Sequence, residues 1–152
     1  IKDTNQQFDF IIIDFPDPSN YSIGKLYTQT FYRQLAKVIA PDGCAVVQST
    51  SPFVARKSFW IINATIESAG FKTKPYHCYL PSFGEWGFVL LSKNKFQPAE
   101  KYPAQLRFIN ADVFAQLCHF PPDMQQVQSE INFLHNQALV NTFEKEWQEY
   151  TR

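Results

Sequence analysis

The chain has 152 residues, enough for one domain with a sizeable core, and 45% hydrophobic and 16% aromatic content is typical of a globular protein rather than a disordered one. Its 14 Lys and Arg residues balance 14 Asp and Glu residues without a basic cluster, which argues against a nucleic-acid partner. The 3 cysteines and 3 histidines are scattered at spacings that fit neither a disulfide framework nor a metal site. We therefore expect a reducing, cytoplasmic compartment and no bound metal.

The segment Phe8–Pro18, with the sequence FDFIIIDFPDP, carries the strongest signal. Four apolar residues run without a break into Asp14, and Asp17 follows three positions later. A short β-branched run bounded by turn residues predicts a strand buried on both faces, as in a parallel α/β sheet. Ligands bind beyond the carboxyl ends of such strands, so two aspartates there suggest a cationic substrate or a proton to be removed. The same local pattern is equally consistent with a turn in which the aspartates only accept hydrogen bonds from backbone amides.

The next segment predicts a helix and a second strand. Thr28 fits an N-cap, and apolar residues recur on one face of the following helix, at Phe31, Leu35, Val38 and Ile39. The turn Pro41–Gly43 is expected to close this helix. Residues 44–47 then predict a buried strand that ends at Gln48, at the same sheet edge as Asp14.

A second helix and a pair of strands complete the α/β part. Ser51 and Pro52 have the pattern of an N-cap followed by proline at the first helical position, and Gly70 is expected to cap the end of that helix. Strands are predicted at 72–80 and 86–92, and their short connection predicts an antiparallel pair. The order is β-α-β-α-β-β, without the strand, Gly-rich loop and helix that hold a nucleotide.

The C-terminal part is predicted to be helical after a polar linker at 93–103. Asn110 fits the N-cap of one helix, and the last helix carries one apolar stripe, formed by Leu139, Val140, Phe143, Trp147 and Tyr150. This stripe is expected to pack on the domain rather than on another subunit. We divide the chain accordingly into an α/β unit at 1–95 and a helical C-terminal extension at 96–152.

These motifs together resemble the polyamine aminopropyltransferase, or spermidine synthase, family. The resemblance covers roughly the first 95 residues and rests on F-D-F-I-I-I-D-x-x-D-P, Pro41-Asp42-Gly43, Val46-Val47-Gln48-Ser49 and Gly84-x-x-Gly87-Phe88. It implies a Rossmann-like methyltransferase-type fold, of which residues 1–95 would be the C-terminal half of the catalytic domain. The closest pattern is that of a bacterial branch in which some members carry an N-terminal membrane region. A homo-oligomer is implied, and a tether of the parent protein to the inner membrane is left open.

The resemblance also implies the chemistry. A diamine attacks the aminopropyl carbon of decarboxylated S-adenosylmethionine, a co-substrate rather than a prosthetic group, and methylthioadenosine leaves. A free alkylamine has a pKa of about 10.4, so a carboxylate must bind the ammonium and take up its proton. The family pattern gives this catalytic role to Asp14, and it gives substrate binding to Asp17, Gln48 and the position of Phe83. The nucleoside-binding half lies upstream in the family, so we interpret the sequence as a fragment that is inactive alone.

Some positions depart from the family pattern. Ser19–Ser22 replace the usual Gly-Pro-Ala loop, Phe83 stands where a tyrosine is usual, and Thr50 stands where an acid often follows Gln-Ser. Two alternatives stay open. One is an S-adenosylmethionine-dependent methyltransferase, because Asp14–Pro18 also resembles a methyltransferase loop, and the other is a non-catalytic binding or assembly module. Trp86 is interpreted as ordinary hairpin packing.

Overall fold

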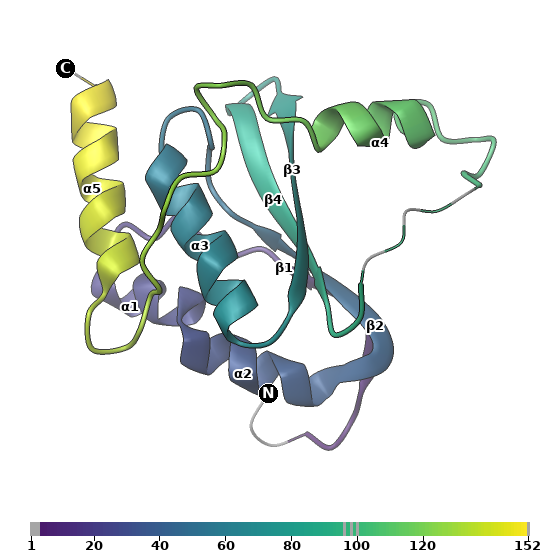
Figure 1. Ribbon diagram of the computed structural model, residues 1–152, viewed down its shortest axis with the longest axis horizontal. Coiled ribbons are helices and arrows are strands. Elements are labelled where there is room, and N and C mark those ends of the chain that lie inside the picture. Colours follow the sequence, from purple (N-terminus) through teal and green to yellow (C-terminus); the bar gives the residue numbers. More distant parts are fainter. Residues whose placement is uncertain (1–3, 96, 98, 100, 152) are drawn as a thin grey trace.

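The computed structural model describes residues 4–95, 97, 99 and 101–151, and its central feature is a mixed sheet (Figure 1). The strands are β1 (Phe8–Ile13), β2 (Ile39–Gln48), β3 (Lys72–Leu80) and β4 (Gly84–Ser92). They lie in the order β1-β2-β4-β3. β1 and β2 are parallel, whereas β4 is antiparallel to both of its neighbours. The predicted antiparallel pairing of the last two strands is confirmed.

Helices cover one face of this sheet. The helical elements are α1 (Tyr21–Gly24), the 3₁₀ turn η1 (Lys25–Tyr27), α2 (Gln29–Val38), α3 (Arg56–Ser68), α4 (Ala111–Leu117) and α5 (Ala138–Tyr150). α2 and α3 contact the sheet, and α5 runs along α3 (Figure 1). On the opposite face, the Phe114 ring of α4 lies 6.3 Å from the Tyr76 ring of β3. No helix among the described residues combines the length and the apolar character that crossing a bilayer requires.

Three predicted helix ends are confirmed because each depends on local chemistry. Thr28 caps α2 by accepting the N–H of Phe31 at 3.4 Å. Asn110 caps α4 by accepting the N–H of Val113 at 2.8 Å. Gly70 follows α3 with φ of 99°, a left-handed conformation that glycine adopts without steric cost.

The start of α3 differs from the prediction at Ser51 and Pro52. The helix begins at Arg56, its N-cap Ala55 offers no side-chain acceptor, and Ser51 instead accepts the N–H of Val54 in a preceding turn. The pattern of an N-cap with proline therefore marks a turn before the helix and not the helix itself.

The cap of α3 comes from α5 instead. The carboxylate of Glu146 accepts the N–H groups of Lys57 and Ser58 at 2.7 and 3.0 Å and the hydroxyl of Ser58 at 2.6 Å. A negative charge at this end also suits the helix dipole. Since Glu146 is remote in sequence, no local pattern could have identified it as the cap.

The turn predicted at Pro41–Gly43 lies within the span of β2. Phe8 pairs with Ile39 but Phe10 pairs with Cys44, so these residues form an irregularity in the strand. Ile39, predicted on the helix face, is the first residue of β2. The chain leaves the helix and enters the sheet without a separate turn.

β1 is buried on one face only, whereas the sequence predicts burial on both. Ile13 is 5% exposed and joins the core, but Ile12 is 71% and Phe10 54% exposed. β1 lies at the edge of the sheet, and its side chains alternate between the helix-covered face and the opposite face. Burial of the opposite face of β1 would require further structure beyond the described residues.

The buried residue Asn132 is one of the contacts that tie the C-terminal segment to the α/β part. Its amide nitrogen donates to the carbonyl oxygens of Gly24 and Tyr27 at 3.1 and 3.2 Å. Its side-chain oxygen accepts the N–H of Leu139 at 3.2 Å, and its own N–H donates to Oγ1 of Thr65 at 2.9 Å. Asn132 therefore joins α1, η1, α3 and α5 at one point.

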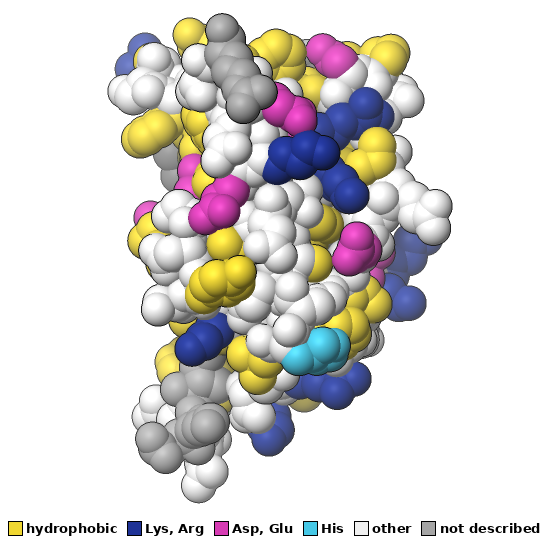
Figure 2. All heavy atoms as spheres, turned by 90° about the vertical axis from the view of Figure 1, so that its left-hand side faces the viewer, with side chains coloured by type: hydrophobic (Ala, Val, Ile, Leu, Met, Phe, Trp, Pro, Cys, Tyr) yellow, Lys and Arg dark blue, Asp and Glu magenta, His cyan; other side chains and the backbone are white. Residues whose placement is uncertain are grey.

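The outer side of α5 is charged, in contrast to the side that packs on α3. Figure 2 shows the face on which α5 runs, and acidic, basic and apolar side chains are interspersed there. Lys145 and Glu149 form an exposed pair at 3.9 Å, one turn apart on this helix. Leu139, Val140 and Phe143 are buried, so the predicted packing of the stripe on the domain is confirmed for these three.

We expect Asn132→Ala to lower the free energy of unfolding by at least about 2 kcal/mol, because it leaves three buried backbone groups without partners. Urea unfolding followed by tryptophan fluorescence measures the change. Asn94→Ala is the matched control, since Asn94 is exposed and its side chain bonds only near the surface. A control loss of no more than about 0.5 kcal/mol is expected. Equal losses in the two variants would contradict a central role for Asn132.

Candidate functional site

The candidate site forms where the carboxyl ends of β1 and β2 meet. The two strands are parallel and Ile13 pairs with Val47, so Asp14 and Gln48 emerge at the same edge of the sheet. β4 runs the opposite way and pairs Phe88 with Gln48, which brings the tip of the β3–β4 hairpin to this edge. Ligands of open α/β sheets bind at such an edge.

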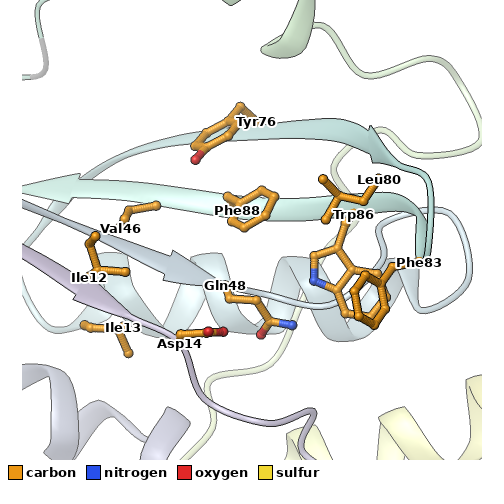
Figure 3. A pocket seen from close by; sticks show the side chains of 10 residues that line it. All are labelled: Ile12, Ile13, Asp14, Val46, Gln48, Tyr76, Leu80, Phe83, Trp86 and Phe88. Carbon is orange, nitrogen blue, oxygen red and sulfur yellow. The ribbon is translucent and has the colours of Figure 1, made fainter.

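A pocket of about 430 Å³ opens there (Figure 3). Its lining residues are Ile12, Ile13, Asp14, Val46, Gln48, Tyr76, Leu80, Phe83, Trp86 and Phe88. In Figure 3 the carboxylate of Asp14 points toward the amide of Gln48, and the rings of Phe83 and Trp86 lie together beside that amide. Apart from the hydroxyl of Tyr76, the rest of the wall is apolar, so the carboxylate and the amide face a largely hydrocarbon surface.

A second pocket of about 640 Å³ adjoins the first and shares Asp14, Gln48, Phe83 and Trp86 with it. Its further lining residues are Phe15, Pro16, Asp17, Ser82 and Trp147. The four residues that the sequence predicts as site residues, Asp14, Asp17, Gln48 and Phe83, all line this second pocket. The structure therefore brings together side chains from two strand ends and a hairpin.

The amide of Gln48 braces the loop after β1 against the hairpin. One orientation of this amide satisfies both Phe15 and Trp86. In it, the amide nitrogen donates to the carbonyl oxygen of Phe15 at 3.1 Å, and the amide oxygen accepts Nε1–H of Trp86 at 2.8 Å. The hydroxyl of Tyr27 lies 3.2 and 3.1 Å from the carbonyl oxygens of Phe15 and Pro16, to which it donates. Gln48 and Tyr27 thus hold the loop that carries both aspartates.

The two aspartates differ in exposure. Asp14 is exposed, whereas Asp17 is half-buried and its Oδ1 has no hydrogen-bond partner among the described residues. Burial raises the pKa of Asp17, and the Thr50 hydroxyl and the Gln48 amide partly offset this rise. The pKa of Tyr27 is also raised. Burial is the main cause, and the negative charges of Asp17 and Asp14 add to it. The pocket wall therefore carries a negative field that favours a cation.

The chain leaves β2 through a strained residue beside Asp17. Thr50 has φ of 63°, which is rare for a β-branched residue. Its carbonyl oxygen accepts the N–H of Gly87 at 2.8 Å, and the N–H of Ser49 donates to the Gly87 carbonyl at 2.9 Å. A Cβ at Gly87 would lie 2.5 Å from the Phe59 ring and 2.8 Å from the Thr50 carbonyl oxygen. Only glycine lets β4 approach the strained residue this closely.

Trp86 and Trp147 line the site although the sequence analysis assigns neither to it. The interpretation of Trp86 as ordinary packing is incomplete, because its ring lies 5.5 Å from that of Phe83 and its indole nitrogen bonds Gln48. The alternation of β4 puts Trp86 on the same face as Phe88, and this pattern would have found it. Trp147 belongs to α5, and no local pattern relates it to the strand ends.

We expect Asp17→Asn to be more stable than the wild type at neutral pH. Because burial raises the pKa of Asp17 above 3.8, the folded state binds this proton more tightly than the unfolded chain, and ionisation destabilises the fold as pH rises through the raised pKa. The advantage of the variant should disappear as pH falls to about 4. Melting temperatures measured across this range test the expectation. Asp123→Asn, at an exposed position, should show no such pH-dependent gain; a gain independent of pH in Asp17→Asn would contradict the argument.

Comparison with known sequences gives consistent results. Residues 1–102 match the family model of the spermine/spermidine synthase domain. The chain is 49% identical over 142 residues to polyamine aminopropyltransferase 2 of Ralstonia nicotianae, covering 92% of this chain and 28% of that protein. It is 47% identical over 147 residues to the polyamine aminopropyltransferase of Leptospira interrogans, covering 97% of this chain and 30% of that protein. The chain thus spans less than a third of the length of these relatives.

Solved structures show a similar fold. A spermidine synthase in complex with the transition state analogue AdoDATO matches with a TM-score of 0.66 and 23% identity, over 95% of this chain and 46% of that chain. The spermidine synthase of Thermotoga maritima matches with a TM-score of 0.62 and 22% identity, over 95% and 45%. The predicted Rossmann-like, methyltransferase-type fold is confirmed.

Proposed function

The chain belongs to the spermine/spermidine synthase family, and from this membership we propose that the full-length protein transfers an aminopropyl group from decarboxylated S-adenosylmethionine to a diamine. By full-length protein we mean residues 1–152 together with any sequence beyond them. The observation that carries the proposal is the pair Asp14 and Asp17 at one pocket with aromatic walls. The co-substrate is supported by the related spermidine synthase solved with AdoDATO.

The reaction requires a neutral nitrogen at a site that binds cations. The lone pair of the diamine nitrogen forms a bond to the aminopropyl carbon, the bond from that carbon to the sulfonium breaks, and its electron pair stays on sulfur in neutral methylthioadenosine. The nitrogen must also lose a proton, since an alkylamine with a pKa of about 10.4 is an ammonium ion at neutral pH. The sulfonium is a good leaving group, so the protein chiefly supplies a proton acceptor, orientation and a negative field.

The two carboxylates suit different parts of this task. Asp14 is the proposed proton acceptor, because it is exposed to the pocket and can exchange its proton with solvent. Asp17 is the proposed anchor for the cationic substrate, since its unpartnered oxygen can accept a hydrogen bond from an ammonium group. Gln48 and Phe83 complete the proposed amine site, and apolar side chains such as Ile12 suit the methylene chain.

Other features of the full-length protein are likewise proposed. Residues 1–95 would belong to the catalytic domain, with 96–152 as a C-terminal extension packed on it, which the contacts of Asn132 and Glu146 support. The chain's three cysteines are free, which supports a cytoplasmic location. A homo-oligomeric state and a membrane tether through upstream sequence follow from the family resemblance alone.

In the full-length protein we expect Asp14→Asn to fold normally but to lose transfer rate by about 10²–10⁴-fold, because the amide keeps the shape and cannot accept the proton. Asp17→Asn should act more on the KM of the diamine than on kcat, since its role is ground-state binding. Steady-state assays with decarboxylated S-adenosylmethionine and putrescine distinguish the two. A rate for Asp14→Asn within a few-fold of wild type would refute the catalytic assignment, and methyl transfer from S-adenosylmethionine would instead favour the methyltransferase alternative.

Phe83→Tyr tests whether the hairpin tip faces the acceptor. Phe83 is 67% exposed and lines both pockets, so a hydroxyl added to its ring would be accessible to a bound diamine. We expect the variant to change the relative kcat/KM among diamines of different length, because the hydroxyl discriminates only where a substrate amine reaches it. Unchanged ratios over 1,3-diaminopropane, putrescine and cadaverine would place Phe83 outside the acceptor site.

A further inference from the structure

Trp147 reaches the candidate site from outside the residues that match the family model. The family model ends at residue 102, whereas Trp147 lies on α5. Its side chain lines the 640 Å³ pocket together with Asp14, Asp17 and Phe83. The indole Nε1 is buried and has no hydrogen-bond partner among the described residues. Because an ammonium group cannot accept a hydrogen bond, this N–H has to be satisfied by water in the pocket, and contact with a cation falls to the face of the ring.

Neighbouring contacts fix the part of α5 that carries this indole. Glu146, the preceding residue, binds the N-terminus of α3 through three hydrogen bonds. One turn earlier, the buried ring of Phe143 lies 5.8 Å from that of Trp147. At the start of α5, Val140 packs so closely on Gly24 of α1 that a Cβ at that glycine would overlap it. The helix segment that carries Trp147 is therefore fixed against α1 and α3.

The charges and rings around the pocket indicate what this wall contacts. Asp14 and Asp17 supply negative charge, and Phe83 and Trp86 supply aromatic faces on the hairpin side. Trp147 adds a third aromatic side chain from the α5 side, and indole is the ring that attracts cations most strongly. When the reacting nitrogen of a diamine lies at Asp14, the second nitrogen lies several ångströms away and is charged. Carboxylates and aromatic faces stabilise an ammonium group in that position.

We infer that Trp147 is a specificity-determining residue that contacts the distal ammonium group of the acceptor and limits the acceptor length. This inference rests on the proposed aminopropyl transfer. Acceptor selection would then depend on the C-terminal extension as well as on the family motifs. Removing the indole opens the pocket on the α5 side and removes one cation-binding surface.

The test uses the full-length protein with Trp147→Ala and Trp147→Phe. Steady-state kinetics with saturating decarboxylated S-adenosylmethionine are measured for 1,3-diaminopropane, putrescine and cadaverine. We expect Trp147→Ala to raise the KM of the wild type's best diamine by roughly 3- to 30-fold with a much smaller change in kcat. The ranking should shift toward the longer diamine, and Trp147→Phe should restore most of the loss. Phe108→Ala, at an exposed aromatic residue that lines neither pocket, should behave as the wild type.

The outcomes separate the inference from the function on which it rests. If folded Trp147→Ala keeps the wild-type ranking and KM, the inference is overturned. Equal losses of kcat/KM for all three diamines, together with a lowered melting temperature, also overturn it, because they indicate a structural role. If Trp147→Ala does not fold, Trp147→Phe decides: its smaller ring should keep the KM within a few-fold of wild type and still shift the ranking toward the longer diamine, and an unchanged ranking overturns the inference. A wild-type protein that is inactive with every diamine overturns the proposed function, and the inference with it.

Discussion

The parallel pairing of β1 with β2 is the constraint on which the site depends. Because Ile13 lies opposite Val47, Asp14 and Gln48 leave the sheet at one edge. β4 then pairs in the opposite direction, with Phe88 at Gln48, and adds the aromatic residues of the hairpin to the same edge. A slip of one residue in either pairing would turn these side chains to the other face of the sheet. The backbone register of these strands thus determines where the polar region of the pocket lies.

Sequence patterns predicted those features that neighbouring residues determine. The caps at Thr28 and Gly70 and the hairpin of β3 and β4 depend on residues a few positions apart. The meeting of Asp14 with Gln48 followed from the general rule that parallel strands end at one edge. Glu146 as the cap of α3 and Trp147 in the pocket wall could not be predicted, because both depend on where a distant helix packs.

Two departures from the family pattern, at Thr50 and Phe83, have different structural meanings. Thr50 lacks the negative charge of the acid usual there, but its buried hydroxyl lowers the pKa of Asp17 against the effect of burial. This contribution helps to keep Asp17 ionised, and it comes from a residue in a strained conformation, as is common near functional sites. Phe83, in contrast, loses the hydroxyl of tyrosine at an exposed position on the pocket rim. The first departure preserves a negative site, and the second changes its shape and polarity.

The cap that Glu146 provides has a consequence for what counts as a unit of folding. The family model matches residues 1–102, yet α3 takes the cap of its N-terminus from residue 146. The core around Trp60 is also completed from beyond that limit, since its indole N–H donates to the Met124 carbonyl at 2.9 Å and its ring lies 5.1 Å from Phe120. A substitution at Glu146 in the tail would therefore also weaken the N-terminus of the helix that it caps. In this protein the matched family domain is therefore shorter than the unit whose contacts stabilise it.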